Sequence, residues 1–434
     1  MNNPDTLKKI FILGYFFPPS SMPASHRLSG FAKYFHKFGY YPIIVSRKWE
    51  NHGSRIYDSF VQTKKNIDYI KTSEYEAYLL PYNPSLRDRL FVKYPKHKFY
   101  SNIRKLLTFT ENLFAGLSDN FYSYNNIYRF SKELISNNKV NYCAIISSGN
   151  PFLLFKFAKK LSSKYKIPYI LDYRDDWNTN ELNKAQNLLQ RIAFLYTSWL
   201  EKRWTKNALF FATVTEKYKE RIENFIGKKG VVVMNGFFEL PNRIKTDRTD
   251  KRLTFLYSGT LYKDQDVEFF LSAFTSFIKK NGNVARVLFV GAGFDDYQKK
   301  MLNKYSLFDS VTVLPRVSTE EIHKLYEQTD VFLQFAYADY KGILPVKLFE
   351  YISYEKPILF CKTDNDSQQL LLDETQTGII ANNYDEVYSI LIKLLNQNPN
   401  TSKFNPNREM IQKYSRENQV KLFADFLDKS LVKQ

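Results

Sequence analysis

The amino-acid sequence predicts an α/β protein built from two doubly wound domains. Its 434 residues are too many for one ordinary hydrophobic core. A strand–loop–helix–strand pattern occurs near the N-terminus and returns in the second half, and such units form parallel sheets. With 44% hydrophobic and 25% charged residues, the composition excludes a mostly disordered chain. The 15 glycines and 16 prolines exclude a collagen-like one.

The first domain is expected over residues 1–230. Residues 10–13 read as a buried strand, 14–19 as the loop that leaves it, 27–38 as a helix closed by Gly39, and 42–46 as the next strand. Later strands are predicted at 144–148, 169–172, 210–214 and 231–234, with helices at 151–165 and 186–208. Residues 50–130 show weak periodicity. Within them, 106–117 predict an amphipathic helix whose apolar side, including Phe109, Leu113 and Phe114, either packs in the core or meets a lipid surface.

A second domain is expected over residues 250–408, after a polar linker at 241–252. Its strands are predicted at 254–258, 286–290, 311–314, 331–335 and 357–360, and its helices at 266–281, 319–329 and 347–354. The tail from 408 to 433 reads as an amphipathic helix, and we expect the segment 410–434 to pack back on the first domain. Ligands of doubly wound sheets bind at the carboxyl ends of the strands.

Charge is concentrated in the first half of the chain. The formal net charge is +19, and residues 1–200 hold 29 basic but only 14 acidic side chains. Such a surface suits an anionic membrane, a polyphosphate-bearing substrate or nucleic acid, although a merely solvated basic surface explains it equally well. No run of about 18 apolar residues predicts a spanning helix. Lys8 and Lys9 before the short apolar run 10–17 imitate a signal peptide, but a buried strand explains that run better.

Cysteine and histidine are scarce. The two cysteines, Cys143 and Cys361, cannot build a disulfide scaffold or a four-cysteine metal site, and the five histidines show no metal-binding spacing. We therefore expect a reducing, cytoplasmic environment and no metal ion.

Glu350 and Lys347 are the most informative residues. They follow Pro345 at a predicted helix start, where the amides of Ile343 and Leu344 are free to face an anion. Lys347 adds positive charge for a diphosphate, and the Glu350 carboxylate can accept hydrogen bonds from both hydroxyls of a ribose. A surface helix with an ordinary Lys–Glu pair is the alternative explanation.

Other strand ends in the second half support the nucleotide interpretation. Small residues there let a backbone approach phosphate closely, and basic side chains follow them. The candidates are Gly259, Thr260, Lys263, Gly291 and the pair Arg316-Val317. Three or four phosphate-compatible strand ends in one half-chain indicate a nucleotide-binding domain.

Taken together, the sequence resembles the retaining GT-B glycosyltransferases of family four, especially bacterial members that build surface polysaccharides. The resemblance runs in order along most of the chain. It is carried by Gly14-Tyr15-Phe16-Phe17-Pro18-Pro19 with Arg27, Asp172-Tyr173-Arg174-Asp175-Asp176-Trp177, Asn235-Gly236, Tyr257-Ser258-Gly259-Thr260, Val290-Gly291-Ala292-Gly293 and Leu344-Pro345-Val346-Lys347-Leu348-Phe349-Glu350-Tyr351. It implies a GT-B fold, with two Rossmann-like domains facing a central cleft.

The resemblance also implies a nucleotide-sugar donor, usually UDP-linked, and no cofactor or metal ion. Glu350 matches the family's ribose-binding glutamate, Lys347 and Lys263 fall where diphosphate contacts are expected, and Arg316-Val317 falls near the base. The first domain is then expected to hold a glycan or polyprenyl diphosphate-linked acceptor, at the inner face of the cell membrane and without nucleic acid. Arg27 and Asn150 are the acceptor-side candidates.

Two departures from the family pattern concern catalysis. The first glutamate of the family's paired motif would fall at Gly342, and a histidine found in many members after the strand near 147–150 is absent, with Asn150 in its region. Asp172, Arg174 and Asp175 are the remaining charged candidates, although an ion pair that holds a loop is an equal reading of them. Retention with the leaving phosphate oxygen taking the acceptor's proton requires no protein base.

Two other functions stay open on the sequence. A UDP-sugar epimerase uses a similar twin-domain architecture but needs acid–base groups around the sugar. The other is a non-catalytic binding protein. A degenerate transferase is compatible with the missing carboxylate at Gly342. A nucleic-acid-binding protein is compatible with the net charge, although no nucleic-acid-binding motif is found.

Overall fold

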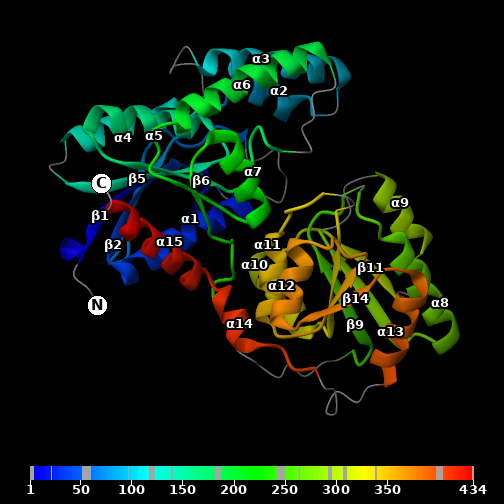
Figure 1. Ribbon diagram of the computed structural model, residues 1–434. Helices are drawn as coiled ribbons and strands as arrows, with labels where there is room; N and C mark the ends of the chain where they lie inside the picture. The colour runs from blue at the N-terminus through cyan, green and yellow to red at the C-terminus, as the bar shows by residue number, and fades with distance from the viewer. Residues whose placement is uncertain are drawn as a thin grey trace. The chain divides into compact units, whose positions relative to one another are not determined.

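The computed structural model describes residues 4–20, 22–50, 60–95, 97–116, 123–137, 140–180, 187–241, 250–262, 264–291, 296–305, 310–337, 340–396 and 404–432 (Figure 1). The chain forms two compact units. The first comprises Met1–Asn235 together with Arg416–Gln434, and the second comprises Gly236–Ser415. Each unit is organised around one sheet.

The sheet of the first unit has the strand order β3-β4-β2-β1-β5-β6-β7-β8. All neighbours are parallel except β3 and β4. The chain therefore reverses its direction of travel across the sheet between β1 and β5, which makes a doubly wound switch point there. The strands are β1 (Lys8–Leu13), β2 (Tyr40–Arg47), β3 (Asp68–Lys71), β4 (Glu76–Leu80), β5 (Tyr142–Gly149), β6 (Tyr169–Tyr173), β7 (Phe211–Thr213) and β8 (Gly230–Val232).

Helices cover this sheet and extend beyond it. On one side, α5 packs on β5, α6 packs on α5, α3 packs on α6 and α2 packs on α3. The helices of the unit are α1 (Pro23–Tyr34), α2 (Leu86–Lys93), α3 (Lys98–Ala115), α4 (Asn125–Asn137), α5 (Leu153–Tyr165), α6 (Leu188–Thr205), α7 (Glu216–Ile226) and α15 (Arg416–Leu431). The sequence indicated neither β3, β4, α2 nor α4, because residues 50–130 carry little periodicity.

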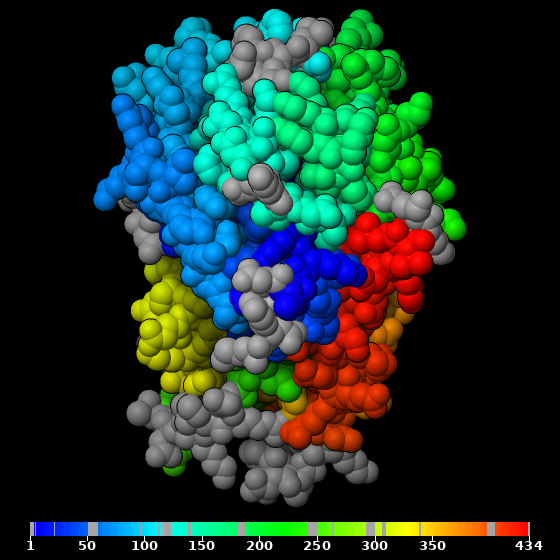
Figure 2. Space-filling view, turned by 90° about the vertical axis from the view of Figure 1, so that its left-hand side faces the viewer, coloured from blue at the N-terminus to red at the C-terminus, as the bar shows by residue number. Residues whose placement is uncertain are grey.

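The C-terminal helix α15 belongs to the first unit, where it packs on α1. The carboxylate of Asp428 accepts hydrogen bonds from Lys8 Nζ at 2.8 Å and from Tyr40 Oη at 2.7 Å. Figure 2 shows the red C-terminal helix beside the blue N-terminal segment. Both ends of the sequence therefore stabilise the same core.

The second unit has the strand order β11-β10-β9-β12-β13-β14, with every pair parallel. This is the strand order of a dinucleotide-binding fold, with its switch point between β9 and β12. Its strands are β9 (Leu253–Ser258), β10 (Ala285–Val290), β11 (Val311–Leu314), β12 (Val331–Phe335), β13 (Ile358–Cys361) and β14 (Gly378–Ala381). Its helices are α8 (Glu268–Asn281), α9 (Asp296–Lys304), α10 (Thr319–Gln328), α11 (Val346–Ser353), α12 (Ser367–Thr375), α13 (Tyr384–Asn396) and α14 (Arg408–Lys413).

The predicted α/β class with two Rossmann-like sheets is confirmed. The single helix predicted from 408 to 433 is wrong, because the structure has two helices, α14 and α15, with a break at Tyr414 and Ser415. At the break, the amide of Phe237 donates to the carbonyl of Tyr414 at 3.2 Å, and Phe237 pairs with Ser415 in a β-bridge. A continuous helix would leave that backbone pairing unmade.

Candidate functional site

Two glycines follow neighbouring strands of the second unit, of which β9 borders the switch point. Gly259 follows β9 with φ 101°, and Gly291 follows β10 with φ 73°, both in the left-handed region that favours glycine. A Cβ at Gly291 would lie 3.1 Å from Cγ of Arg316 and 3.9 Å from Cα of Gly259. The strand ends therefore lie close together, and the side chain of Arg316 packs against the space beside Gly291. The amides of Gly259 and Gly291 donate to the carbonyls of Val290 and Leu314, both at 2.8 Å.

Arg316 and Thr260 join this cluster. The Arg316 guanidinium donates to Oγ1 of Thr260 at 3.2 Å, although the two residues follow different strands. The structure therefore brings together Gly259, Thr260, Gly291 and Arg316, with Val317 next to Arg316 in the chain, as the sequence suggested. Lys263, and also Ala292 and Gly293, lie outside the described residues.

Lys347 supplies a half-buried positive charge at the same edge. Its Nζ lies 3.4 Å from the centroid of the Tyr257 ring, and its Cδ lies 3.9 Å from where a Cβ of Gly259 would be. Burial lowers the pKa of Lys347 well below its usual range. Among the described residues no carboxylate pairs with this ammonium, so the cation–π contact is its main compensation. Such a site attracts an anion.

Glu350 lies one turn further along α11 and is held by a chain of buried hydroxyls. The amide of Ser258 donates to Tyr351 Oη at 2.8 Å, and Tyr351 Oη lies 3.0 Å from Ser258 Oγ. Ser258 Oγ lies 2.6 Å from Tyr326 Oη, which donates to Glu350 Oε2 at 3.4 Å. Since the Ser258 amide can only donate, Tyr351 Oη accepts from it and can donate to Ser258 Oγ. That hydroxyl can donate to Tyr326 Oη, which in turn donates to the Glu350 carboxylate.

Burial, followed by the charge of Glu350, raises the pKa of Tyr326 well above its usual range. Tyr326 therefore stays protonated and remains a donor to Glu350. The sequence analysis missed Tyr326, Tyr351, Ser258 and Tyr257 as site residues. The Tyr257-Ser258 pair at a strand end, and a tyrosine directly after Glu350, were the only available signals, and Tyr326 had none.

The segment before α11 presents backbone amides. Within the described ranges, neither the amide of Ile343 nor that of Leu344 has a hydrogen-bond partner, and Pro345 caps the helix without a side-chain bond. Gly342 has φ 82°, and its amide donates to the Asp366 carboxylate. At that φ a glutamate would be strained, so the local backbone agrees with the absence of a carboxylate at position 342.

In the first unit, Arg27 and Asp172 form one buried ion pair. Arg27 Nη2 lies 2.6 Å from Asp172 Oδ1, and its Nε donates to the same carboxylate at 3.0 Å. Ser148 Oγ also donates to Asp172 at 2.8 Å, while Arg27 donates to the carbonyls of Val233 and Met234. The pair ties α1 to the carboxyl ends of β5 and β6 and to the segment after β8.

Arg174 and Asn150 meet beside this pair. The Arg174 guanidinium donates to the carbonyl of Gly149 at 2.8 Å and to that of Asn150 at 2.7 Å, and it lies 5.4 Å from the centroid of the Phe16 ring. Burial lowers the pKa of Arg174. Asp175 is exposed, next to Arg174. The residues predicted in the first domain therefore gather at the carboxyl ends of β5 and β6. Four lie at or next to these ends, namely Asn150, Asp172, Arg174 and Asp175, and Arg27 pairs with Asp172 there.

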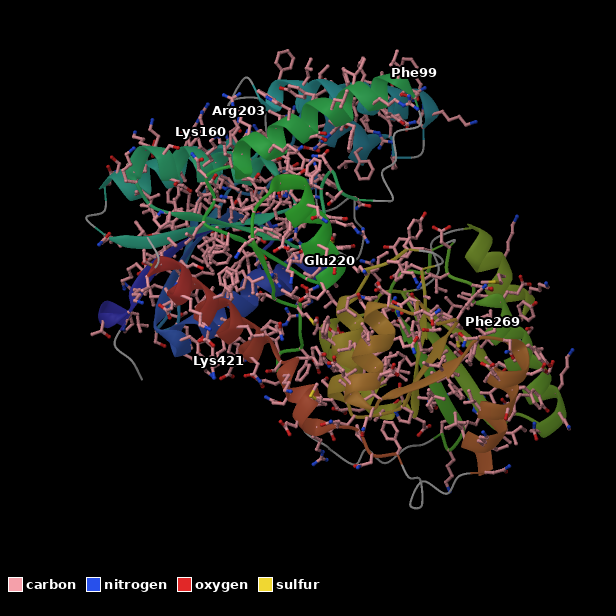
Figure 3. The ribbon with its side chains drawn as sticks, viewed as in Figure 1. Phe99, Lys160, Arg203, Glu220, Phe269 and Lys421 are labelled. Carbon is pink, nitrogen blue, oxygen red and sulfur yellow. The ribbon has the colours of Figure 1, made fainter. Side chains whose placement is uncertain are left out.

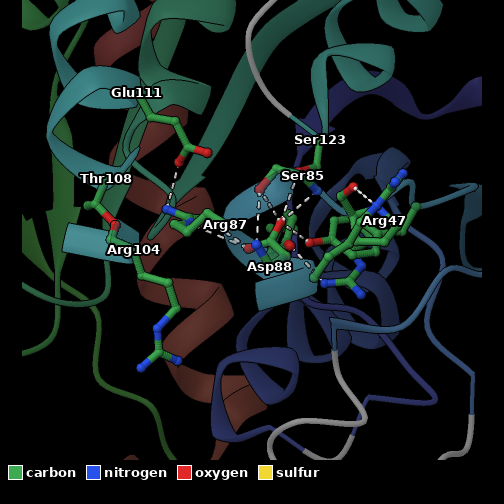
Figure 4. A network of polar contacts seen from close by, with 12 residues as sticks. Arg47, Ser85, Arg87, Asp88, Arg104, Thr108, Glu111 and Ser123 are labelled. Atoms are coloured by element: carbon green, nitrogen blue, oxygen red, sulfur yellow. Dashed lines mark hydrogen bonds and ion pairs between the residues drawn. The ribbon is translucent and has the colours of Figure 1, made fainter. Parts of the chain in front are cut away.

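A second polar network supports the loop after β1. Arg47 donates to Tyr15 Oη at 2.7 Å and lies between aromatic rings, 3.4 Å from the Tyr82 centroid and 3.9 Å from that of Trp49. Tyr82 Oη donates to Asp88 at 2.6 Å (Figure 4). This network fixes the segment 14–19 to β2 and α2. Of its members only Tyr15 had been singled out from the sequence, as part of the motif that begins at Gly14.

The described part of the chain holds no cluster of histidine, cysteine, aspartate and glutamate side chains that could bind a metal ion. No helix among the described residues is both long and apolar enough to cross a bilayer.

Comparison with known proteins agrees with this geometry. The family "Glycosyl transferases group 1" matches residues 240–418, which include nearly all of the second unit. No curated protein matches the sequence. The match supports a glycosyltransferase.

Solved structures resemble the whole chain at low sequence identity. Sucrose-phosphate synthase from Thermosynechococcus elongatus has a TM-score of 0.62 at 12% identity, covering 98% of this chain and 100% of its own. The Anabaena protein HepE, solved with UDP and glucose, has a TM-score of 0.59 at 12% identity, covering 97% and 100%. The catalytic domain of starch synthase IV from Arabidopsis thaliana, bound to ADP and acarbose, has a TM-score of 0.59 at 10% identity, covering 98% and 99%. These neighbours establish the fold as GT-B.

Proposed function

We propose that the protein is a retaining glycosyltransferase that moves a hexosyl or N-acetylhexosaminyl unit from a UDP-sugar to a glycan or a polyprenyl diphosphate-linked acceptor. We place it in cell-surface polysaccharide synthesis, at the inner face of the cell membrane. The observation that carries the proposal is Lys347, a half-buried ammonium without a carboxylate partner among the described residues. It lies beside Gly259 and one helical turn before Glu350.

The donor would bind at the carboxyl edge of the second sheet. Lys347 and the free amides of Ile343 and Leu344 would neutralise its diphosphate, as a helix N-terminus with a nearby cation does in other anion sites. Glu350 would accept hydrogen bonds from the ribose hydroxyls, oriented by Tyr326. Arg316, with Val317, would lie near the base or the phosphates, bonded to Thr260. The UDP-bound HepE neighbour supports the choice of UDP.

The chemistry would rest on stabilising the leaving group. As the bond from the sugar to the diphosphate breaks, negative charge grows on the phosphate oxygen beside Lys347 and the free amides. The acceptor hydroxyl attacks from the same face, and that phosphate oxygen takes its proton, so the products are the glycosylated acceptor and UDP. Binding of a divalent metal is not required in this scheme, because the cation and the amides carry the charge.

The first unit would hold the acceptor. Arg174 and Asn150 are candidates to contact it, and Asp175 is the exposed carboxylate beside them. The Asp172 carboxylate already accepts hydrogen bonds from Arg27 and from Ser148. We therefore assign Asp172 and Arg27 to positioning the loops after β5 and β6 rather than to proton transfer.

A thermal-shift titration tests the donor site. UDP and UDP-sugars should raise the melting temperature, because a ligand that binds only the folded state stabilises it. Glu350→Ala should remove most of that shift, while Glu320→Ala, an exposed glutamate on α10, should keep it. Turnover is then measured with a polyprenyl diphosphate-linked acceptor. Absence of any nucleotide-dependent shift would contradict the proposal, and an epimerised donor formed without acceptor would show a different reaction.

A further inference from the structure

Two neighbouring helices of the first unit turn apolar side chains to the solvent. On α3 they recur every seventh residue, and on α6 they recur at spacings of four, three and four, so each set forms a stripe along one helix face. Their exposed fractions run from 41% for Leu113 to 72% for Leu188. The stripes consist of Phe99, Leu106 and Leu113 on α3, and of Leu188, Ile192, Leu195 and Trp199 on α6.

This arrangement is unusual for a water-soluble surface. An amphipathic helix of a globular domain normally directs its apolar stripe to the core, and isolated exposed leucines are common, but aligned ones are not. Here the core side of α6 is also apolar, with Leu200 and Trp204 buried. The exposed stripes are therefore additional to what folding of the unit requires.

The charged side chains that α2, α3 and α6 expose to solvent have one sign. Each of their acidic residues is buried or nearly so: Asp88 on α2, Glu111 on α3 and Glu201 on α6. These carboxylates accept internal hydrogen bonds or ion pairs, for example Glu111 with Arg87 at 2.8 Å. The exposed charged side chains are all basic: Arg89, Lys93, Lys98, Lys105, Arg191, Lys202 and Arg203.

From this geometry we propose that the exposed face of α3 and α6 is a docking surface for an anionic lipid bilayer. We name it the α3–α6 face, made of the two stripes and the exposed basic residues of these two helices: Lys98, Lys105, Arg191, Lys202 and Arg203. Figure 3 shows Phe99 at one end of this helical layer and Arg203 toward the other, both on the side away from the sheet. Apolar side chains enter the acyl boundary of such a bilayer while basic side chains meet its phosphates.

Charge selects the bilayer over other occupants. A second copy of the chain would bring a second basic surface against the first, and like charges disfavour that contact. Nucleic acid would use the cations but gains nothing from aliphatic side chains such as Leu188, Ile192 and Leu195. An anionic bilayer is complementary to both components of the face.

The two helices are also held firmly enough to act as one surface. Tyr196 Oη on α6 donates to the carbonyl of Leu113 on α3 at 2.6 Å. On the other side, Arg87 of α2 bridges Asp88, at 3.1 Å, and Glu111 of α3 (Figure 4). The α3–α6 face is thus a fixed part of the first unit, the unit to which the acceptor is assigned. The inference deepens the proposed function by supplying a way to reach a lipid-linked acceptor, but its observations are independent of the donor site.

Vesicle sedimentation with the full chain tests the inference. Vesicles containing phosphatidylglycerol should bind the protein, and phosphatidylcholine vesicles should bind it far less. Leu195→Glu should strongly weaken binding, while Leu370→Glu on α12 of the second unit should not, although the two leucines are similarly exposed at 67% and 61%. Lys202→Gln with Arg203→Gln should weaken partition about thirtyfold if each cation contributes about 1 kcal/mol. The matched pair Lys279→Gln with Lys280→Gln on α8 should have no effect.

Tryptophan fluorescence gives a second readout. Of the four tryptophans, Trp199 alone is more than half exposed, so its emission should shift to the blue when vesicles are added, and Trp199→Phe should abolish that shift. Equal binding of the Leu195→Glu and Leu370→Glu variants, binding independent of lipid charge, or self-association through this face without lipid would each overturn the inference. UDP-dependent stabilisation in the same variants reports separately on the donor site, so failure of one proposal is distinguishable from failure of the other.

Discussion

The ammonium of Lys347 lies 3.4 Å above the Tyr257 ring, and a buried tyrosine is its nearest electrostatic compensation. A cation–π contact offsets only part of the cost of removing an ammonium from water. The empty protein is therefore destabilised at the position where an anion would bind. Lys347 would therefore raise the affinity for an anionic ligand and lower the stability of the ligand-free protein.

Lys347→Met should separate these two quantities. Without ligand, the variant should be more stable by on the order of 1 kcal/mol, because an apolar side chain of similar length replaces an uncompensated charge. Binding of UDP should weaken by about 2 kcal/mol, the usual contribution of a charged hydrogen bond. Urea denaturation with and without UDP measures both.

Lys356→Met is the matched control. Lys356 Nζ donates to the carbonyls of Tyr326, Glu327 and Thr329 at 2.7–2.9 Å, where α10 ends. The same substitution should therefore lower stability there. Destabilisation by Lys347→Met as well would contradict the interpretation of Lys347 as an unpaired charge.

Glu350→Gln should reduce the preference for UDP over 2′-deoxy-UDP rather than abolish nucleotide binding. A carboxylate accepts from two ribose hydroxyls, whereas an amide offers a single acceptor oxygen. Calorimetric titration with UDP and with 2′-deoxy-UDP should show a clear preference for UDP in the wild type and a preference reduced about tenfold in the variant. An unchanged preference would mean that Glu350 does not contact the ribose.

Tyr326→Phe should weaken UDP binding about three- to tenfold, because Glu350 loses the donor that orients it. Tyr354→Phe provides the control, since the Tyr354 hydroxyl lies 2.6 Å from Nδ1 of His323, in the same aromatic cluster. The UDP preference over 2′-deoxy-UDP distinguishes positioning from mere loss of stability. If both phenylalanine variants reduced that preference equally, Tyr326 would have no special role.

Glu201 should make the first unit less stable as the pH rises. Burial raises the pKa of Glu201 from 4.5 to about 7, so the folded protein keeps a proton that the unfolded chain has already released. Stability should therefore fall between about pH 4.5 and pH 7 and then level off, by at most about 3 kcal/mol.

Glu201→Gln should remove this decline. Its amide can donate to Tyr173 Oη while its oxygen accepts from Asn178, so the hydrogen bonds that Glu201 makes at 2.8 Å and 2.6 Å have replacements. Denaturation across this pH range compares it with Glu220→Gln on α7, where the glutamate is exposed (Figure 3). A decline that persists in Glu201→Gln would assign the pH effect to another group.

The sequence analysis reached the second unit more completely than the first. Its strands are short buried runs bounded by glycine, and Gly259, Gly291 and Pro345 mark turns that only a few backbone conformations permit. The cluster of Gly259, Thr260, Arg316, Lys347 and Glu350 followed from those strand ends, because parallel strands end at one edge of a sheet.

The remaining parts depend on contacts distant in sequence. Tyr326 on α10 meets Ser258 at the end of β9 and Glu350 on α11 only in the folded unit. A tyrosine on an amphipathic helix gives no local signal of that role. Arg27 and Asp172 were selected for separate roles, and only folding shows that they neutralise each other across 145 residues. The apolar side of the helix predicted over 106–117 was left between core and lipid because periodicity identifies an apolar face without saying what covers it, and the stripe on α6 was not predicted.

The bridge between Phe237 and Ser415 has a consequence for dissecting the chain. It sets the entrance and exit of the second unit side by side, so this unit is an insertion within the first. A stop codon placed before Arg416 would keep the second unit, including α11 with Glu350, and would remove α15 from the first unit, where it packs on α1. The two units therefore cannot be separated by a single cut. Expressing the first unit alone requires deleting residues 236–415 and joining Asn235 to Arg416.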